Sequence, residues 1–143
     1  MARGDSKVIA ANVNNKTIGS DTLAYLLITN TFASINANST LVIAGVTGAT
    51  VGGNYAGKTT IASVTSAQTA NVTAIDYADI SFAANASNPT DALCLVVMND
   101  TLTGDPVLKI TDLTTNGTTA VDLTQGFTFN INAGGSYTYT ANV

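Results

Sequence analysis

The sequence of 143 residues lacks histidine, tryptophan and glutamate, and it holds one cysteine. Only 10% of the residues are charged, against about a quarter in ordinary globular domains. Without histidine or glutamate, few side chains remain to move protons near neutral pH, so the usual hydrolytic triads and acid/base pairs are excluded. Zinc is excluded as well, because the sequence has no imidazole ligand and only one possible thiolate. We expect the protein to be no enzyme and to bind no cofactor.

The charge balance limits the partners. Five basic residues face nine acidic ones, all aspartate, for a formal net charge of −4. Nucleic-acid binding requires basic patches that this sequence does not offer, so no nucleic-acid partner is expected. No apolar stretch approaches the ~18 residues of a membrane span, and the first residues lack the apolar core of a secretory signal. We therefore expect synthesis in the cytoplasm and no membrane partner.

The single cysteine, Cys94, lies inside the apolar run of residues 92–98. A lone thiol in such surroundings is typical of core packing rather than of a nucleophile. The run itself is continuous instead of alternating, which predicts a central strand covered on both faces.

The composition favours strands over helices. The chain has 24 threonines and many Val, Ile and Asn residues, but few of the residues that fill exposed helix positions. This predicts an all-β protein with a compact β-sandwich or jelly-roll body. Besides those at the C-terminal end, the expected strands are residues 8–13, 23–29, 41–46, 59–64, 71–75, 80–83 and 92–98. For the second of these, Ser20 and Asp21 could instead cap a short helix, but Thr22 and Thr29 favour the strand.

The C-terminal third predicts two hairpins. Residues 127–132 alternate between apolar and polar, with Phe127 and Phe129 on the expected core face, and a Gly-Gly pair then leads into residues 137–143. Upstream, residues 108–111 alternate in the same way. Asn-Gly at 116–117 supplies a tight turn before a strand at 118–123.

One segment matches a phosphate-binding motif. Gly52, Gly57, Lys58 and Thr59 fit the pattern G-x-x-x-x-G-K-[ST] letter for letter. That site needs a helix starting at the lysine, because the phosphates rest on the N–H groups of its first turn. The residues after Lys58 are instead typical of a strand. We therefore interpret the segment as a glycine-rich loop that enters a strand, rather than as a nucleotide site.

Two loops are rich in oxygen ligands of the kind that calcium prefers. One is the Asp-Tyr-Ala-Asp segment at 76–79, and the other combines Asn99, Asp100 and Asp105. Neither has the spacing of an EF-hand, so no metal site is predicted, and calcium stays an open alternative.

The first 19 residues differ from the rest. Residues 1–19 are polar and rich in asparagine, which predicts a flexible N-terminal arm attached to a single β-sandwich domain over residues 20–143. Such an arm could become ordered against a neighbour, and its candidate contact residues are Lys7, Val8, Asn12 and Asn14. At the other end, Tyr137 and Tyr139 share one face of the last expected strand and are candidates for core packing or for an oligomer contact.

From residue 19 onward, the order of features resembles a family of small structural virion proteins of tailed bacteriophages, encoded among head and tail genes. The segments that carry the resemblance are residues 20–29, 52–61, 76–82, 92–99 and 106–113, followed by Asn-Gly at 116–117. The resemblance implies a capsid decoration or cement protein on the outer surface of the phage head. Its partners would be the major capsid protein and its own copies, in a homotrimer placed at three-fold axes.

Two alternatives belong to other classes. A tail or fibre subunit of the virion would use the same β body but stack into rings or spikes. A cell-surface, adhesin-like or glycan-binding β-domain would act as an isolated module. The absence of tryptophan counts against the glycan-binding alternative, since sugars usually stack on aromatic side chains.

Overall fold

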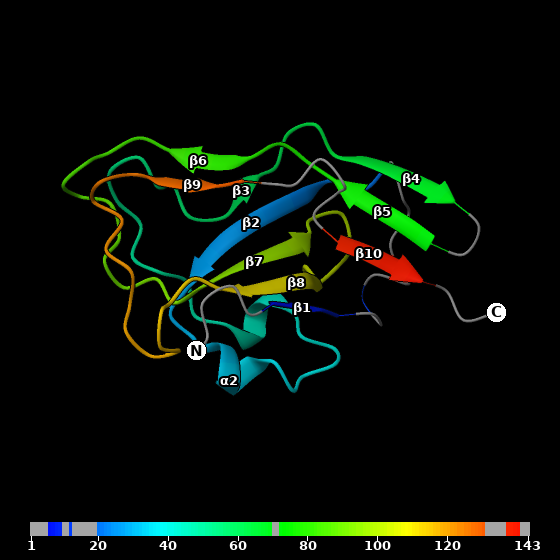
Figure 1. Cartoon of the computed structure of the whole chain (residues 1–143), viewed down its shortest axis with the longest axis horizontal. Coiled ribbons are helices and arrows are strands. Elements are labelled where there is room, and N and C mark those ends of the chain that lie inside the picture. The colour runs from blue at the N-terminus through cyan, green and yellow to red at the C-terminus, as the bar shows by residue number, and fades with distance from the viewer. Residues whose placement is uncertain (1–5, 10–11, 13–19, 70–71, 131–136, 141–143) are drawn as a thin grey trace.

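The computed structural model describes residues 6–9, 12, 20–69, 72–130 and 137–140 (Figure 1). The described chain is mostly β-structure, which confirms the all-β prediction. Its elements, in chain order, are β1 (Ser6–Val8), β2 (Leu23–Ile28), α2 (Phe32–Ile35), the 3-10 turn η1 (Ile43–Gly45), β3 (Thr59–Thr60), β4 (Thr65–Thr69), β5 (Val72–Asp76), β6 (Ile80–Phe82), β7 (Cys94–Asn99), β8 (Val107–Asp112), β9 (Phe127–Phe129) and β10 (Tyr137–Thr140).

A five-stranded antiparallel sheet forms the centre of the molecule, in the order β1-β8-β7-β2-β3. Strand β7 lies in the middle and pairs with the full length of β2, from Asn99 opposite Leu23 to Cys94 opposite Ile28. All six residues of β7 are buried. This confirms the central, doubly covered strand that the apolar run predicted. The segment after Asp21 forms strand β2, so the strand prediction is confirmed and the alternative of a short helix is wrong.

Side chains of the central sheet alternate between two apolar clusters. On one face, Leu23, Leu27, Leu95 and Val97 join a cluster that we call the sandwich-side cluster. On the other face, neighbouring residues of the same strands join a helix-side cluster, whose members include Ala24, Ile28, Val96 and Met98. Both faces of the sheet are therefore withdrawn from water.

Two smaller sheets lie over the sandwich side. They are the pair β6-β9, which Figure 1 shows above the central sheet, and the three-stranded sheet β10-β5-β4, which it shows to the right of the central sheet. This layer and the loops next to it supply four buried residues to the sandwich-side cluster, which are Ile75, Tyr77, Ile80 and Leu123. Tyr55 and Ile61, on either side of β3, join the same cluster. The result is a sandwich-like body in which one large sheet packs against two small ones.

The helix side is covered by short segments. Helix α2 is capped by Thr31, whose Oγ1 accepts a hydrogen bond from the Ser34 N–H, and it buries Ile35 against the sheet. Leu41 and Ile9 complete the cover, with exposed fractions of 2% and 1%. In Figure 1 this layer lies below the central sheet.

The predicted C-terminal hairpin is wrong, although both of its strands exist. Strand β9 pairs with β6, with Phe127 opposite Phe82 and Phe129 opposite Ile80. Strand β10 pairs with β5 instead. Alternation predicts a strand and its faces, but it does not identify the partner strand.

Two further predicted strands are absent from the described chain. In place of a strand at 41–46, the chain has an isolated bridge of Val42 with Pro106 and the turn η1 at Ile43–Gly45. Apolar side chains of this segment pack against the helix-side cluster, and the Ile43 N–H bonds to the Gly104 and Asp105 carbonyls. Residues 118–123 contribute only an isolated bridge, Val121 with Ala92, so the second hairpin is wrong as well. Asn116 instead organises a turn: its Oδ1 accepts hydrogen bonds from the N–H groups of Thr118 and Thr119.

Strand β4 was not predicted at all. Its sequence, Thr-Ser-Ala-Gln-Thr, has neither an apolar run nor clean alternation. It nevertheless pairs with β5 over five consecutive positions, from Thr65 opposite Asp76 to Thr69 opposite Val72. The predicted strands at 8–13, 59–64 and 71–75 form at shifted positions, as β1, β3 and β5.

Candidate functional site

The side chains best suited to covalent chemistry are used in packing. Cys94 is fully buried, and this burial together with nearby Asp112 raises the pKa of its thiol to about 12. A thiol with that pKa is not a nucleophile at neutral pH. The core-packing interpretation of Cys94 is thus confirmed.

The hydroxyl of Tyr55 is also engaged in hydrogen bonds within the fold. Its hydroxyl accepts a hydrogen bond from the Leu27 N–H at 2.9 Å and lies 3.3 Å from the Leu27 carbonyl oxygen. Burial raises the pKa of Tyr55 to about 12. The hydrogen bond of the Tyr55 hydroxyl connects the loop before β3 to strand β2. Because of the raised pKa, the hydroxyl stays protonated at physiological pH.

The loop that matched the phosphate motif folds as a tight turn. Gly52 and Tyr55 pair with each other through both backbone hydrogen bonds. A Cβ on Gly52 would lie 2.4 Å from the carbonyl oxygen of Ser87, so this glycine permits a close approach of two loops. Thr59 then enters β3 opposite Tyr25. With a strand where a helix would be required, the loop is not a phosphate cradle, as the sequence interpretation held.

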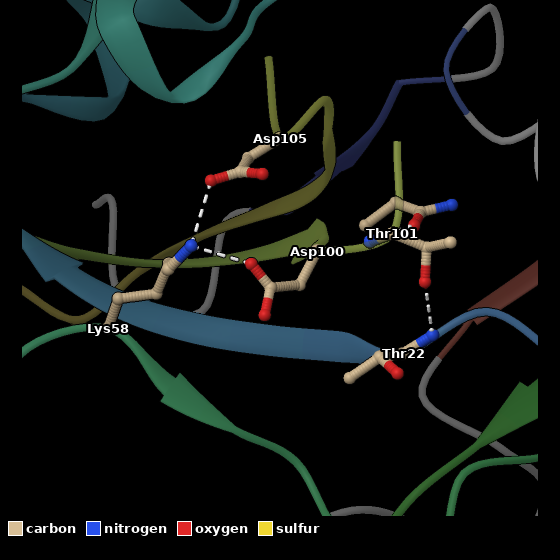
Figure 2. A network of polar contacts seen from close by, with 6 residues as sticks. Thr22, Lys58, Asp100, Thr101 and Asp105 are labelled. Atoms are coloured by element: carbon tan, nitrogen blue, oxygen red, sulfur yellow. Dashed lines mark hydrogen bonds and ion pairs between the residues drawn. The ribbon is translucent and has the colours of Figure 1, made fainter. Parts of the chain in front are cut away.

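Lys58 lies at the centre of an acidic pair (Figure 2). Its ammonium nitrogen is 2.6 Å from Oδ1 of Asp100 and 3.0 Å from Oδ2 of Asp105. Asp100 directly follows β7, and Asp105 precedes β8 with a positive φ of 46°. The hydrogen bonds to Asp100 and then to Asp105 raise the pKa of Lys58, so the ammonium form is favoured.

A second set of polar contacts surrounds this ion pair. The Thr22 N–H donates to Oγ1 of Thr101 at 2.8 Å, as Figure 2 shows. Deeper in the same corner, the Asn99 amide donates to Oδ2 of buried Asp21 at 2.7 Å. Together these contacts hold the start of β2 and the loop before β3 to the β7-β8 connection.

In this corner, the charge of Lys58 offsets part of the negative charge of two aspartates. Asp100 and Asp105, which the sequence offered as calcium ligands, instead surround the ammonium group of Lys58. Within the described residues, no group of three acidic, histidine or cysteine side chains is placed to hold a metal ion. The arrangement serves as an internal clamp at the end of the sheet.

The N-terminal contact candidates belong to the sheet. Lys7 lies opposite Ile110 and Val8 opposite Lys109 in the pairing of β1 with β8. The ammonium of Lys7 also donates to the carbonyl of Asn36. The described part of the predicted arm is therefore an edge strand of the body and not a separate segment.

Asn12 fastens the same end of the chain. Its side-chain amide donates to the carbonyls of Leu41 and Val107, at 2.8 Å each, and only 7% of the residue is exposed. This is a role inside the chain, different from the contact with a neighbour that the sequence suggested. Asn14, the fourth candidate of the arm, lies outside the described residues.

Tyr137 and Tyr139 lie in β10, where the backbone pairs them with Ile75 and Thr73 of β5. Strand β10 is an edge of the three-stranded sheet. The backbone thus places both residues on an edge strand of this sheet, and the oligomer contact stays a prediction.

Most of the exposed surface is uncharged. Among the described residues, Lys58, Asp79 and Asp122 are the exposed charged ones, and the other exposed positions are mainly Thr, Ser, Asn, Ala and Gly. The same part of the chain shows no cavity. It also contains no helix long and apolar enough to cross a membrane.

The sequence matches no protein-family model and no curated protein, and no solved structure matches the chain.

Sequence reasoning identified Lys58, Asp100 and Asp105 separately but missed that they meet. The two aspartates are 42 and 47 residues away from the lysine. No local spacing reports such a contact, because it depends on the order of strands in the sheet. The buried pair of Asn99 and Asp21 was missed for the same reason.

Proposed function

We propose that this protein is a structural subunit of a tailed-phage virion that decorates the outer surface of the head. The order of sequence features from residue 19 onward supports this proposal. So does the all-β body, whose framework suits a rigid building block. In this proposal the major capsid protein is the binding partner, and the protein is made in the host cytoplasm before it joins the particle.

The observation that carries the proposal is the use of reactive side chains in folding together with a nearly uncharged surface. Cys94 and Tyr55 are buried with raised pKa values, and Lys58 is paired with two carboxylates. The exposed residues are mainly small or hydroxyl-bearing. A protein whose task is to lie on a shell needs such a surface and does not need a catalytic group.

The charge supports a position on the outside of the head. A net charge of −4 gives the protein no attraction for packaged DNA. A homotrimer at three-fold axes is the proposed arrangement, because closed symmetric oligomers match the axes that an icosahedral shell repeats. No enzymatic activity is proposed.

The direct test is to locate the protein on phage particles. An antibody raised against the purified full chain is applied, with immunogold detection, to intact tailed-phage particles that carry the gene. We expect gold on the heads, and none with pre-immune serum. Gold confined to tails or fibres would overturn the head assignment in favour of the tail subunit, and unlabelled particles would overturn the virion proposal.

A further inference from the structure

The three-stranded sheet has two edge strands among the described residues. Its order is β10-β5-β4, so β5 lies in the middle and each neighbour pairs on one side within the described part of the chain. An edge strand presents backbone N–H and C=O groups that another strand can bind. Strand β4 is five residues long and β10 is four, and alternate residues of each direct these groups away from β5.

Both edges lack the features by which proteins usually prevent strand addition. Those features are charged side chains, prolines and bulges. No charged residue and no proline occurs in residues 59–75, which include β4, or in residues 123–143, which include β10. The pairing of β4 with β5 also runs over five positions without a register shift. Among the described residues, no strand pairs with the outer side of either edge.

The edge strands of the central sheet are shorter and have lysines in or next to them. Strand β1 is three residues long and has Lys7 at its middle, and β3 is two residues long and directly follows Lys58. Short strands and lysines are devices that discourage edge-to-edge pairing. The contrast within one molecule indicates that the open edges of the three-stranded sheet have a partner.

We propose that this partner is a second copy of the chain, with β4 of one copy hydrogen-bonded to β10 of the next so that the copies close into a ring. The two edges are similar in length, and both are uncharged. Pairing of β4 with β4 across a two-fold axis would leave β10 open in every copy. Pairing of unlike edges, repeated around a closed ring, uses both edges of every copy through a single kind of contact.

This inference goes beyond the proposed function. It names the strands through which copies join, and it holds whether the assembled protein lies on a head, on a tail or elsewhere. Immunogold labelling can therefore fail while the ring forms, and the ring can fail while labelling succeeds.

The test uses cross-linking between copies. Ala67→Cys places a thiol in β4, and Thr138→Cys places one in β10; both positions lie opposite Ala74 of β5 and therefore share one face of the sheet. The two full-length variants are co-expressed, purified together and treated with a short bis-maleimide, and the products are separated on a denaturing gel. We expect a covalent dimer from the co-expressed pair and none from either variant alone. Wild type should give none either, since Cys94 is fully buried.

Each result has one meaning. A dimer from Ala67→Cys alone would show pairing of like edges and overturn the arrangement. No dimer from the co-expressed pair would overturn the interface. Ser6→Cys on β1, co-expressed with either variant, is the matched control for an edge of the other sheet and should give no dimer.

Light scattering during size-exclusion chromatography completes the test. A ring predicts one fixed mass, a whole multiple of 14.5 kDa, that does not rise with concentration. A monomer at every concentration, or a mass that grows without limit, would overturn the closed ring.

Discussion

The central sheet and the three-stranded sheet lie in the same small body, but they differ in how they are covered. In the central sheet, both faces are packed against apolar clusters, and the edge strands are short and accompanied by lysines. In the three-stranded sheet, the edge strands are longer and uncharged. The first arrangement suits a sheet that holds one chain together, and the second suits a sheet that other chains can extend.

The largest expected effect is on the central sheet. Leu27→Ala removes a fully buried side chain from β2 and should lower the free energy of unfolding by about 2–5 kcal/mol, because a cavity remains in the core. Urea denaturation followed by circular dichroism measures the loss. Val51→Ala, at a residue that is 62% exposed, is the control and should change stability by less than about 0.5 kcal/mol. Equal losses in both variants would break the comparison.

A smaller loss is expected between the layers. Phe127 is half-buried and stacks on Phe82 with 5.4 Å between ring centroids. Phe127→Ala should cost about 2–3 kcal/mol, less than the ~3–5 kcal/mol typical of a fully buried phenylalanine. The same denaturation experiment applies, with exposed Thr128→Ala as the control. A change near zero would show that β6-β9 adds little to the sandwich.

Asn12→Ala tests how firmly the N-terminal end is held to the central sheet. The substitution removes two buried hydrogen bonds, to the carbonyls of Leu41 and Val107, and should cost about 1–2 kcal/mol. Thermal unfolding gives the difference, and Asn130→Ala at an exposed position is the control. If Asn12→Ala proved as stable as wild type, the two hydrogen bonds of Asn12 would contribute little to the attachment of the N-terminal end to the central sheet.

The ion pair at Lys58 should matter less, because its side chain is 41% exposed. Lys58→Met should cost no more than about 1 kcal/mol, and the difference should shrink in 1 M salt. Since the folded protein raises the pKa of Lys58, the contribution is fully present below the ordinary lysine pKa of 10.5 and is lost as the pH rises through the folded value. Denaturation of wild type and variant at neutral and strongly alkaline pH checks this. Lys58→Arg, which keeps the charge, should retain most of the effect.

The smallest effect on folding gives the sharpest comparison of the two sheets. Gln68→Lys adds a charge to the edge at β4, and Ser6→Lys adds one to the edge at β1. Each should change the free energy of unfolding by less than about 0.5 kcal/mol. Light scattering should show a lower solution mass for Gln68→Lys and an unchanged mass for Ser6→Lys. An equal response of the two variants would remove the distinction between the edges.

The sequence predicted strands where hydrophobicity alone determines them. Strand β7 was found because a continuous apolar run has few other uses in a chain with little helix propensity. Strand β4 was missed because its residues are small and polar, and it exists through its pairing with β5. The turn η1 was mistaken for a strand because Leu41 and Ile43 are apolar in either conformation, and only the neighbouring layer decides between the two.

Partners were harder to predict than elements. The Gly-Gly pair after β9 suggested a hairpin with β10, but each strand pairs with one much earlier in the chain. The clamp of Lys58 with Asp100 and Asp105 depends on the same long-range order. Residue types were sufficient to show that Cys94 is not reactive, because its apolar neighbours in sequence are also its neighbours in space.

The position of Cys94 makes its thiol a natural probe for local opening of the central sheet. The chain has one thiol, it begins the central strand β7, and none of it is exposed. A thiol reagent can modify it only when the centre of the sheet opens, so the labelling rate of the native protein counts those openings directly. Assembly through β4 and β10 does not involve strand β7. A lower labelling rate of Cys94 in the assembled protein would therefore measure how much the joined edges stabilise the central sheet against opening.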